Sequence, residues 1–329
     1  MLLKPLFFRG FITMKKIIWA LDAFEESPSV YQHEVEWLRT RLARIKTRGA
    51  ITVIPTFVMG PAQMQLQSEL SRPWFETYVP AARKVLTEKL RGVTLGKPIQ
   101  LADPQVLIQK KSSLTESVKT LLQFAKAEGA SEILIGSHGR KGVDRLLLGS
   151  FAETLMLLSP IPVLYVGAGT DVPKSLKKIL FPTDLSVKSQ GVYRNLLRFA
   201  QTAKAEVILF HAIPNPIDPV LQSGAYLLGG GWIPAPLFLE KNRERAEKSG
   251  SQWIQLGKKL GVPVRFECVT FVPSVVEAVE GRAKAKDINM IAMAAQSGRL
   301  GSTLIGSIAR QIVRVAPKPV WIDRAKKNV

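Results

Sequence analysis

The chain of 329 residues contains the same succession of segments twice. Residues 15–22 have a basic start, an apolar run and a final aspartate, and residues 177–184 repeat this pattern. Two further anchors recur in the same order: Gly149-Ser150 with Gly306-Ser307, and Pro160-Ile161-Pro162-Val163 with Pro317-Lys318-Pro319-Val320. Three anchors in one order indicate two copies of one domain.

Strand and helix signals alternate within each copy. In the first copy, apolar residues at helical spacing follow residue 34, strands are predicted over 51–58 and 105–109, and a helix is predicted over 114–128 with Gly129 as its stop. The second copy predicts a helix over 192–203 and strands over 207–210, 264–269, 288–294 and 320–322. This alternation is typical of parallel βαβ units. We therefore expect an α/β fold of two tandem domains, each an open five-stranded parallel sheet with helices on both faces.

The domain boundary is predicted at Gly167-Ala168-Gly169-Thr170, a break of small residues that follows the fifth strand of the first copy. We place domain 1 at residues 14–170 and domain 2 at 171–329. Residues 1–13 precede the first strand as an extension, and they lack the long apolar core of a secretory signal.

Composition indicates a folded cytoplasmic protein. Hydrophobic residues make up 46% of the chain and charged residues 22%. The longest apolar stretch, 146–169, is interrupted by Glu153, Pro160 and Pro162, which argues against a membrane span. Cys268 is the only cysteine, so no intramolecular disulfide forms, and three scattered histidines predict no metal cluster.

The formal net charge of +20 is spread over both copies. Residues 1–170 carry 22 basic and 14 acidic groups (+8), and the remainder carries 24 and 12 (+12). No basic tail concentrates this charge, so a solvated basic surface is favoured over a nucleic-acid site.

A glycine-rich loop joins the apolar run 132–135 to a helix predicted over 151–158. Gly136 and Gly139 are expected to adopt positive φ and to let the backbone approach phosphates, while Gly149 and Ser150 present amides and a hydroxyl at the helix start. Arg140, Lys141 and Arg145 add cations. Asp22, at the end of the first strand, would accept hydrogen bonds from ribose hydroxyls or approach Mg²⁺ on the phosphates.

Two of these residues have simpler interpretations. Ser150 and Glu153 have the spacing of a capping box, in which the serine serves only to begin the helix. His138 is favoured as a packing or hydrogen-bonding residue of the loop, since no nucleophile matches it as a base. His33 and His211 are interpreted as structural in the same way.

The motif Gly136-x-x-Gly139, nine residues, then Gly149-Ser150 resembles the adenine-nucleotide signature of the universal stress protein family, and Asp22 resembles its first-strand aspartate. The resemblance spans nearly the whole chain as two copies. It implies strand order 3-2-1-4-5, ATP binding, Val58 against the adenine, and pairing through the last strand, here as an intramolecular pseudo-dimer with a homodimer possible. The loop residues His138 and Arg140 are included in the predicted site.

The second copy departs from this signature. Ala295 is taken to replace the first glycine, Gly298 is kept, and seven residues rather than nine separate it from Gly306-Ser307. We therefore assign the nucleotide to domain 1, with a weak or altered ligand site in domain 2 as the alternative. An insertion over residues 214–236 is predicted to cover its own domain, or else to act as a lid.

The resemblance implies a regulatory ATP-binding module of the stress response rather than an enzyme. A slow ATPase or nucleotidyl transferase is an alternative, but the chain has no Walker-type Gly-Lys-Ser/Thr run and no paired histidines. A nucleotide-independent scaffold, or a nucleic-acid binder that uses the +20 charge, is the other alternative.

Overall fold

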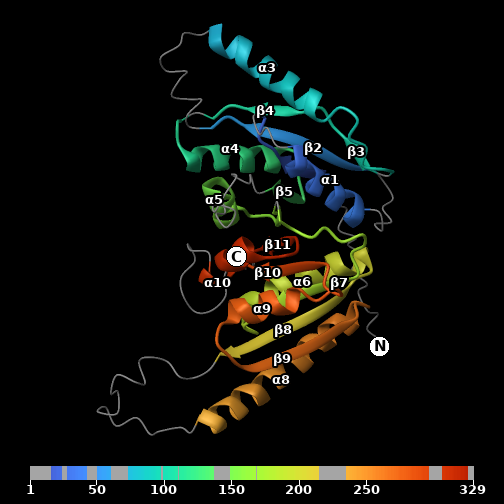
Figure 1. The fold of residues 1–329 in the computed structure, drawn as a ribbon, viewed down its shortest axis with the longest axis vertical. Coiled ribbons are helices and arrows are strands. Elements are labelled where there is room, and N and C mark those ends of the chain that lie inside the picture. Colours follow the sequence, from blue (N-terminus) through green and yellow to red (C-terminus); the bar gives the residue numbers. More distant parts are fainter. Residues whose placement is uncertain are drawn as a thin grey trace, which may run out of the picture.

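A computed structural model describes residues 16–23, 28–42, 50–60, 73–97, 99–109, 111–136, 149–167, 169–214, 235–295 and 306–324. The expected extension 1–13, most of the 214–236 insertion and the greater part of both glycine loops lie outside this part of the chain. Figure 1 shows the two copies stacked end to end, with domain 1 above domain 2.

Domain 1 alternates strands and helices as predicted. Its elements are β1 (Lys16–Ala20), α1 (Pro28–Leu42), β2 (Ile51–Val58), α3 (Pro73–Lys89), β3 (Ile99–Leu101), β4 (Gln105–Leu107), α4 (Leu114–Ala127), β5 (Glu132–Gly136), α5 (Ser150–Leu158) and β6 (Val163–Val166).

Domain 2 repeats the order. Its elements are β7 (Lys178–Pro182), α6 (Val187–Ala203), β8 (Glu206–Pro214), α8 (Ala235–Lys259), β9 (Val264–Val272), α9 (Val275–Ala283), β10 (Met290–Ala294), α10 (Ser307–Val315) and β11 (Val320–Asp323).

All strands of the described residues belong to one 11-stranded sheet in the order β3-β2-β1-β5-β6-β11-β10-β7-β8-β9, with β4 also paired to β2. Within each copy the neighbouring strands are parallel. If β3 and β4 are counted as two pieces of one third strand, each copy has the order 3-2-1-4-5. The expected fold class is confirmed.

The two copies share one sheet because β6 pairs with β11 in antiparallel fashion, Leu164 opposite Trp321. The strands of domain 1 and domain 2 therefore run in opposite directions. Consequently their carboxyl ends lie at opposite edges of the continuous sheet, and each copy has its own ligand-binding edge.

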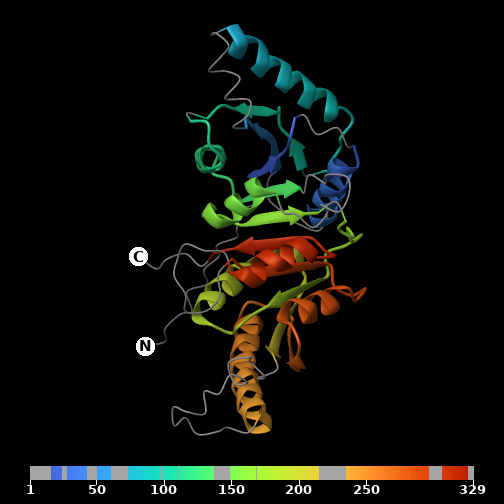
Figure 2. The same cartoon turned by 60° about the vertical axis from the view of Figure 1, so that its left-hand side comes forward.

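Each face of the sheet carries a hydrophobic core that continues from one copy into the other. Helices α1, α3, α6 and α8 contribute to one core, and α4, α5, α9 and α10 to the other. Figures 1 and 2 show the long helices α3 and α8 at the two far ends of the molecule. The sheet is thus buried on both sides, as near-continuous apolar strands require.

Polar contacts on both faces tie the copies together. On one face, Arg314 of α10 donates to Glu153 of α5 at 2.5 Å. On the other face the contact across the copies is made by Arg41 of α1, which within its own domain pairs with Glu132 at the start of β5, with Nη2 to Oε2 at 2.6 Å. The Arg41 guanidinium also lies 4.7 Å from the ring centroid of Phe199, which belongs to α6 of domain 2.

Local signals account for most element boundaries. Ser113 accepts a hydrogen bond from the amide of Glu116 and begins α4, and Gly129 has a φ of +63° just past its end, as predicted. Sequence reasoning missed α3 and α8, and it missed β3, which is only three residues long. No helix within the described ranges is long and apolar enough to cross a membrane.

The side chains of Arg41 and Glu132 are at most 1% exposed, so neither charge is solvated by water. We expect each charge to stabilise the fold mainly by compensating the other. Arg41→Met leaves the Glu132 carboxylate buried without its partner and should lower the free energy of unfolding by about 3–5 kcal/mol. Arg41→Met with Glu132→Met should recover most of that loss. Urea unfolding followed by circular dichroism measures both, with Glu153→Gln as a partly exposed control that costs about 1 kcal/mol or less.

Candidate functional site

Three of the predicted site residues meet at the carboxyl edge of domain 1. Asp22 follows β1, Val58 ends β2 and Gly136 ends β5, and β1 lies between the other two strands. Helix α5 runs back between the parallel strands β5 and β6, so its first residues, Gly149 and Ser150, reach the same edge. His138, Gly139 and Arg140 lie outside the described residues.

Gly136 is required by packing rather than by backbone conformation. It is a strand residue paired with Val166 and is not among the residues with positive φ, so the expected positive φ is wrong. A Cβ at this position would lie 1.6 Å from Oε1 of Glu34, whose carboxyl group occupies the space above the Gly136 Cα. The start of the glycine loop is therefore set by a side chain of α1.

Glu34 is buried in an apolar setting, 1% exposed. Its Oε2 accepts a hydrogen bond of 2.5 Å from Nε1 of Trp19 on β1. Burial raises the pKa of Glu34 to about 8, against the smaller opposing effect of the Trp19 hydrogen bond. At neutral pH the carboxyl group is thus mostly protonated, so little negative charge lies against Gly136.

Ser150 is not a helix cap. The N-cap of α5 is Gly149, with φ −58° and ψ 142° and no side-chain hydrogen bond to the first amides, and Ser150 is the first helical residue. The capping-box interpretation is wrong because the helix begins one residue earlier than its spacing assumes. Glu153, its expected partner, instead accepts the hydrogen bond from Arg314 across the domain interface. The exposed Ser150 hydroxyl and the α5 amides are thus available to a ligand.

Two tyrosines surround Asp22 on the face that α1 and α3 cover. The Tyr31 hydroxyl donates to the Asp22 backbone carbonyl at 2.5 Å. Burial, and then the negative charge of Asp22, raises the pKa of Tyr78 to about 12. Asp22 itself is half-buried at the end of β1, so its carboxylate is held close to the strand ends.

Val58 is half-buried, lies opposite Leu107 of β4 and packs against the core on the α4 and α5 face. This places an apolar wall at the strand ends on the side of the sheet from which α5 begins. Among the described residues, no group of three or more potential metal ligands occurs.

Strand registers correct the alignment of the second copy. Ile18 lies opposite Ile133 in domain 1, and the equivalent Leu180 lies opposite Ile291 in domain 2. Gly136 therefore corresponds to Ala294, not to Ala295 as the spacing suggested. Measured from these positions, the segment 295–305 is one residue shorter than 137–148, so the loop loses one residue rather than two.

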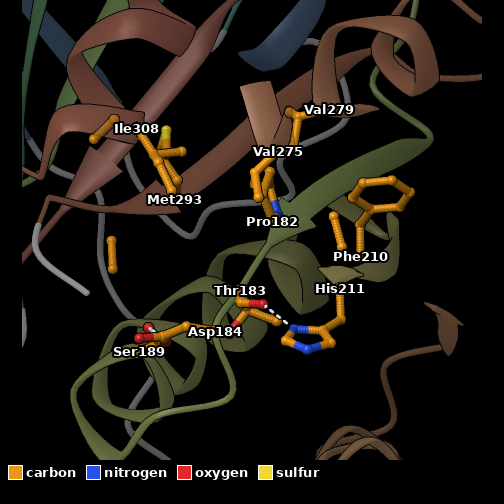
Figure 3. A pocket seen from close by; sticks show the side chains of 13 residues that line it. Pro182, Thr183, Asp184, Ser189, Phe210, His211, Val275, Val279, Met293 and Ile308 are labelled. Atoms are coloured by element: carbon orange, nitrogen blue, oxygen red, sulfur yellow. Dashed lines mark hydrogen bonds between the residues drawn. The ribbon is translucent and has the colours of Figure 1, made fainter. Parts of the chain in front are cut away.

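Domain 2 has a pocket at its own carboxyl edge, a feature that the sequence reasoning underestimated (Figure 3). It is lined by Pro182, Thr183, Asp184, Ser189, Phe210, His211, Ala212, Val275, Val279, Met293, Ala294, Ile308 and Ala309. His211, interpreted as purely structural, lines this pocket while its Nδ1 lies 2.8 Å from the Thr183 carbonyl oxygen.

Asp184, the counterpart of Asp22, takes part in the start of α6. Its Oδ1 accepts hydrogen bonds from the Ser186 amide at 3.0 Å and from the Ser189 hydroxyl at 2.6 Å. Because Ser189 donates its proton to Asp184 and His211 faces a carbonyl, these three residues do not form a nucleophilic triad.

The chain belongs to the universal stress protein family. The family profile matches twice, over residues 13–167 and 175–324, and so covers nearly all of the chain. No curated protein sequence matches the chain.

Solved structures agree on the fold. A universal stress protein from Archaeoglobus fulgidus DSM 4304 is 16% identical, covers 96% of this chain and 98% of its own, and has a TM-score of 0.55. A functionally unknown protein from Pseudomonas aeruginosa PAO1 is 14% identical over 95% and 93%, with a TM-score of 0.58. A putative universal stress protein from Pseudomonas aeruginosa UCBPP-PA14 is 16% identical over 94% and 93%, with a TM-score of 0.54. These three chains thus share the fold over nearly their whole lengths.

Gly136→Ala tests the packing role of the first motif glycine. The added methyl group overlaps the Glu34 carboxyl group and should lower the free energy of unfolding by about 1–3 kcal/mol. Gly149→Ala is the matched control, because a Cβ there meets nothing within 4 Å and φ is −58°. Denaturant unfolding measures both. Equal effects of the two substitutions would show that Glu34 does not restrict position 136.

Glu34 also predicts a pH dependence of stability. Its pKa rises from about 4.5 in the unfolded chain to about 8 in the folded one, so the folded state holds the proton more tightly. Between these values the free energy of unfolding should fall as the pH rises, by at most about 1.4 kcal/mol per pH unit from this group. Glu34→Gln keeps an acceptor for Trp19 and should flatten the curve between pH 4.5 and 8. The difference between the two unfolding profiles is the measurement, and parallel profiles would contradict a protonated Glu34.

Proposed function

We propose that the protein is a cytoplasmic regulatory module of the stress response that binds ATP through domain 1. The single observation that carries phosphate binding in this proposal is the start of α5, which no described side chain caps. Helix α10 of domain 2 begins in the same way at Gly306, so the assignment to domain 1 rests on the complete glycine motif of its loop. Gly149 is the N-cap of α5 without any side-chain hydrogen bond, and it lies at the strand edge that also carries Asp22. Free amides with the positive end of a helix dipole form a site for phosphate.

The other predicted residues would complete a nucleotide site around this helix start. Val58 would provide an apolar surface for the adenine, and Asp22 would accept hydrogen bonds from the ribose or approach Mg²⁺ on the phosphates. Gly139, His138 and Arg140 belong to the intervening loop and are proposed as the residues that contact the phosphates. The exposed Ser150 hydroxyl supports this role because α5 does not use it as a cap.

Binding rather than catalysis is proposed because the described site residues offer no base beside a nucleophile. Asp22 and Ser150 lie at different element ends, and the nearby Tyr78 has its pKa raised rather than lowered. A nucleotide held in this way would act by stabilising one arrangement of the loop and helix start, a population shift rather than a reaction.

The pairing of β6 with β11 supports an intramolecular pseudo-dimer. It uses the edge of each half-sheet that could otherwise pair with a second chain. A homodimer would therefore need a different surface, such as the outer strands β3 and β9 or the helices.

Calorimetric titration of the purified protein with Mg-ATP tests the proposal. We expect one ATP per chain, binding lost in Gly139→Val, and binding kept in Gly298→Val, which changes a glycine of the domain 2 loop. A Cβ-branched side chain at Gly139 would block the backbone approach that a phosphate requires. If wild type binds no ATP, or if Gly298→Val alone abolishes binding, the assignment to domain 1 fails.

Two further measurements separate the alternatives. ATP turnover well above background, lost in Asp22→Asn, would indicate a phosphate-transferring enzyme instead. Affinity for DNA or RNA that falls by roughly 10³–10⁵ between low and moderate salt would indicate a nucleic-acid binder that uses the +20 charge.

A further inference from the structure

We infer that Glu34 is a positioning residue of the domain 1 site, and that ATP binds there only while the Glu34 carboxyl group is protonated. The ligand follows from the proposed function, whereas the proton dependence follows from the packing of Glu34. Its carboxyl group fills the space above Gly136, the residue at which β5 ends and the motif Gly136-x-x-Gly139 begins. The position of this strand end therefore depends on the state of Glu34.

Helix α6 of domain 2 identifies the counterpart of Glu34. Residues 194–203 of α6 have the same succession of buried, half-buried and exposed positions as residues 32–41 of α1. This match places Leu196, which is fully buried in the core, where α1 has Glu34. An apolar side chain is thus sufficient to pack the helix against the sheet at this position.

The two residues that contact Glu34 also differ between the copies. Trp19, which donates to its carboxyl group, corresponds to Phe181 in the repeated first strand, and Gly136 corresponds to Ala294. Domain 2 thus lacks the indole N–H at the first position and carries a methyl group at the strand end. Since domain 2 folds with three apolar residues at these positions, packing alone does not account for the buried carboxyl group of domain 1.

Among the described residues of the neighbouring strands, no cation is available to compensate a charge on Glu34. Helix α1 lies against β5 and β6, and Trp19 reaches Glu34 from β1. The ionisable residues of these three strands are engaged elsewhere: Glu132 pairs with Arg41, Lys16 pairs with Glu128, and Tyr165 packs in the core on the other face.

The ionisable residues of α1 itself leave Glu34 with the same surroundings. Arg39 donates to the Thr94 carbonyl, Tyr31 donates to the Asp22 carbonyl, Glu36 is exposed, and His33 precedes Glu34 on the helix. Burial raises the pKa of Glu34 to about 8, and the Trp19 hydrogen bond opposes this rise without cancelling it. The carboxyl group is therefore neutral when it lies against Gly136 at neutral pH.

Ionisation of Glu34 would weaken ATP binding in two ways. A carboxylate against Gly136 places a negative charge at the strand edge where the phosphates are proposed to bind, and like charges repel. The carboxylate would also be buried with a single hydrogen bond, so it could reach water only if α1 shifted away from β5. ATP affinity should therefore fall as the pH rises, and bound ATP should in turn raise the pKa of Glu34.

Calorimetric titration of the full chain with Mg-ATP at pH 7 and pH 9 tests the inference. With a pKa of about 8, roughly nine-tenths of the Glu34 side chains are protonated at pH 7 and about one-tenth at pH 9, so the affinity should fall about tenfold. Glu34→Gln cannot ionise and should have the same affinity at both pH values. Glu36→Gln, at an exposed position of the same helix, is the matched control and should keep the wild-type fall.

A proton count separates this role from a purely structural one. ATP binding by wild type at pH 8 should take up about half a proton per chain, measured as the dependence of the binding heat on the ionisation enthalpy of the buffer. Glu34→Gln should abolish this uptake, whereas a substitution that only loosened the site would lower the affinity equally at both pH values. The count on wild type requires no variant, so it decides the matter even if Glu34→Gln does not fold.

Three results would overturn the inference and leave the proposed function intact. They are equal ATP affinity of wild type at pH 7 and pH 9, no proton uptake by wild type at pH 8, or the same loss of affinity with pH in Glu34→Gln as in wild type. If wild type binds no ATP at pH 7, the proposed function fails, and the proton linkage of ATP binding fails with it.

Discussion

The antiparallel pairing of β6 with β11 is the contact on which the rest of the structure depends. Each strand is four residues long and would otherwise be an exposed edge of a half-sheet. Their pairing satisfies these backbone groups and joins two five-stranded halves into one sheet, so the cores on both faces extend across the junction. It also reverses the strand direction, which directs the two ligand-binding edges away from each other and lets the copies diverge independently.

Helix α1 links this framework to the candidate site. Glu34 and Arg41 lie two turns apart on this helix. The Glu34 carboxyl group lies against Gly136 at one end of β5, and Arg41 pairs with Glu132 at the other end. Arg41 also contacts Phe199 of the second domain. The position of the loop start in domain 1 is thus connected through a single helix to the domain interface, and a shift of α1 would move both.

The two copies show how one fold can lose part of a site and keep the rest. Domain 1 keeps a glycine at the strand end, where it makes room for Glu34, while α5 of domain 1 and α10 of domain 2 both begin at an N-cap glycine without a side-chain hydrogen bond. Domain 2 has Ala294 at that strand end, Asp184 bound to the start of α6, and a pocket whose described lining is largely apolar. Divergence has therefore acted on the strand ends and left the sheet order unchanged.

The sequence alone determined the repeat, the fold class, most strands and the helix that ends at Gly129, because apolar periodicity and turn residues act over a few neighbouring positions. It also indicated that Asp22, Val58, Gly136 and Ser150 lie at the same edge of the domain 1 sheet. Only the tertiary structure showed that Gly136 makes room for Glu34, that Gly149 rather than Ser150 caps α5, that Ala294 is the counterpart of Gly136, and that domain 2 holds a pocket. One sign of buried polar contacts under α1 was present in the sequence, which is that the charged residues Glu34 and Arg41 stand on its apolar stripe. Their partners lie about 90 to 100 residues away on β5, and such contacts are decided by packing across the sheet rather than by local pattern.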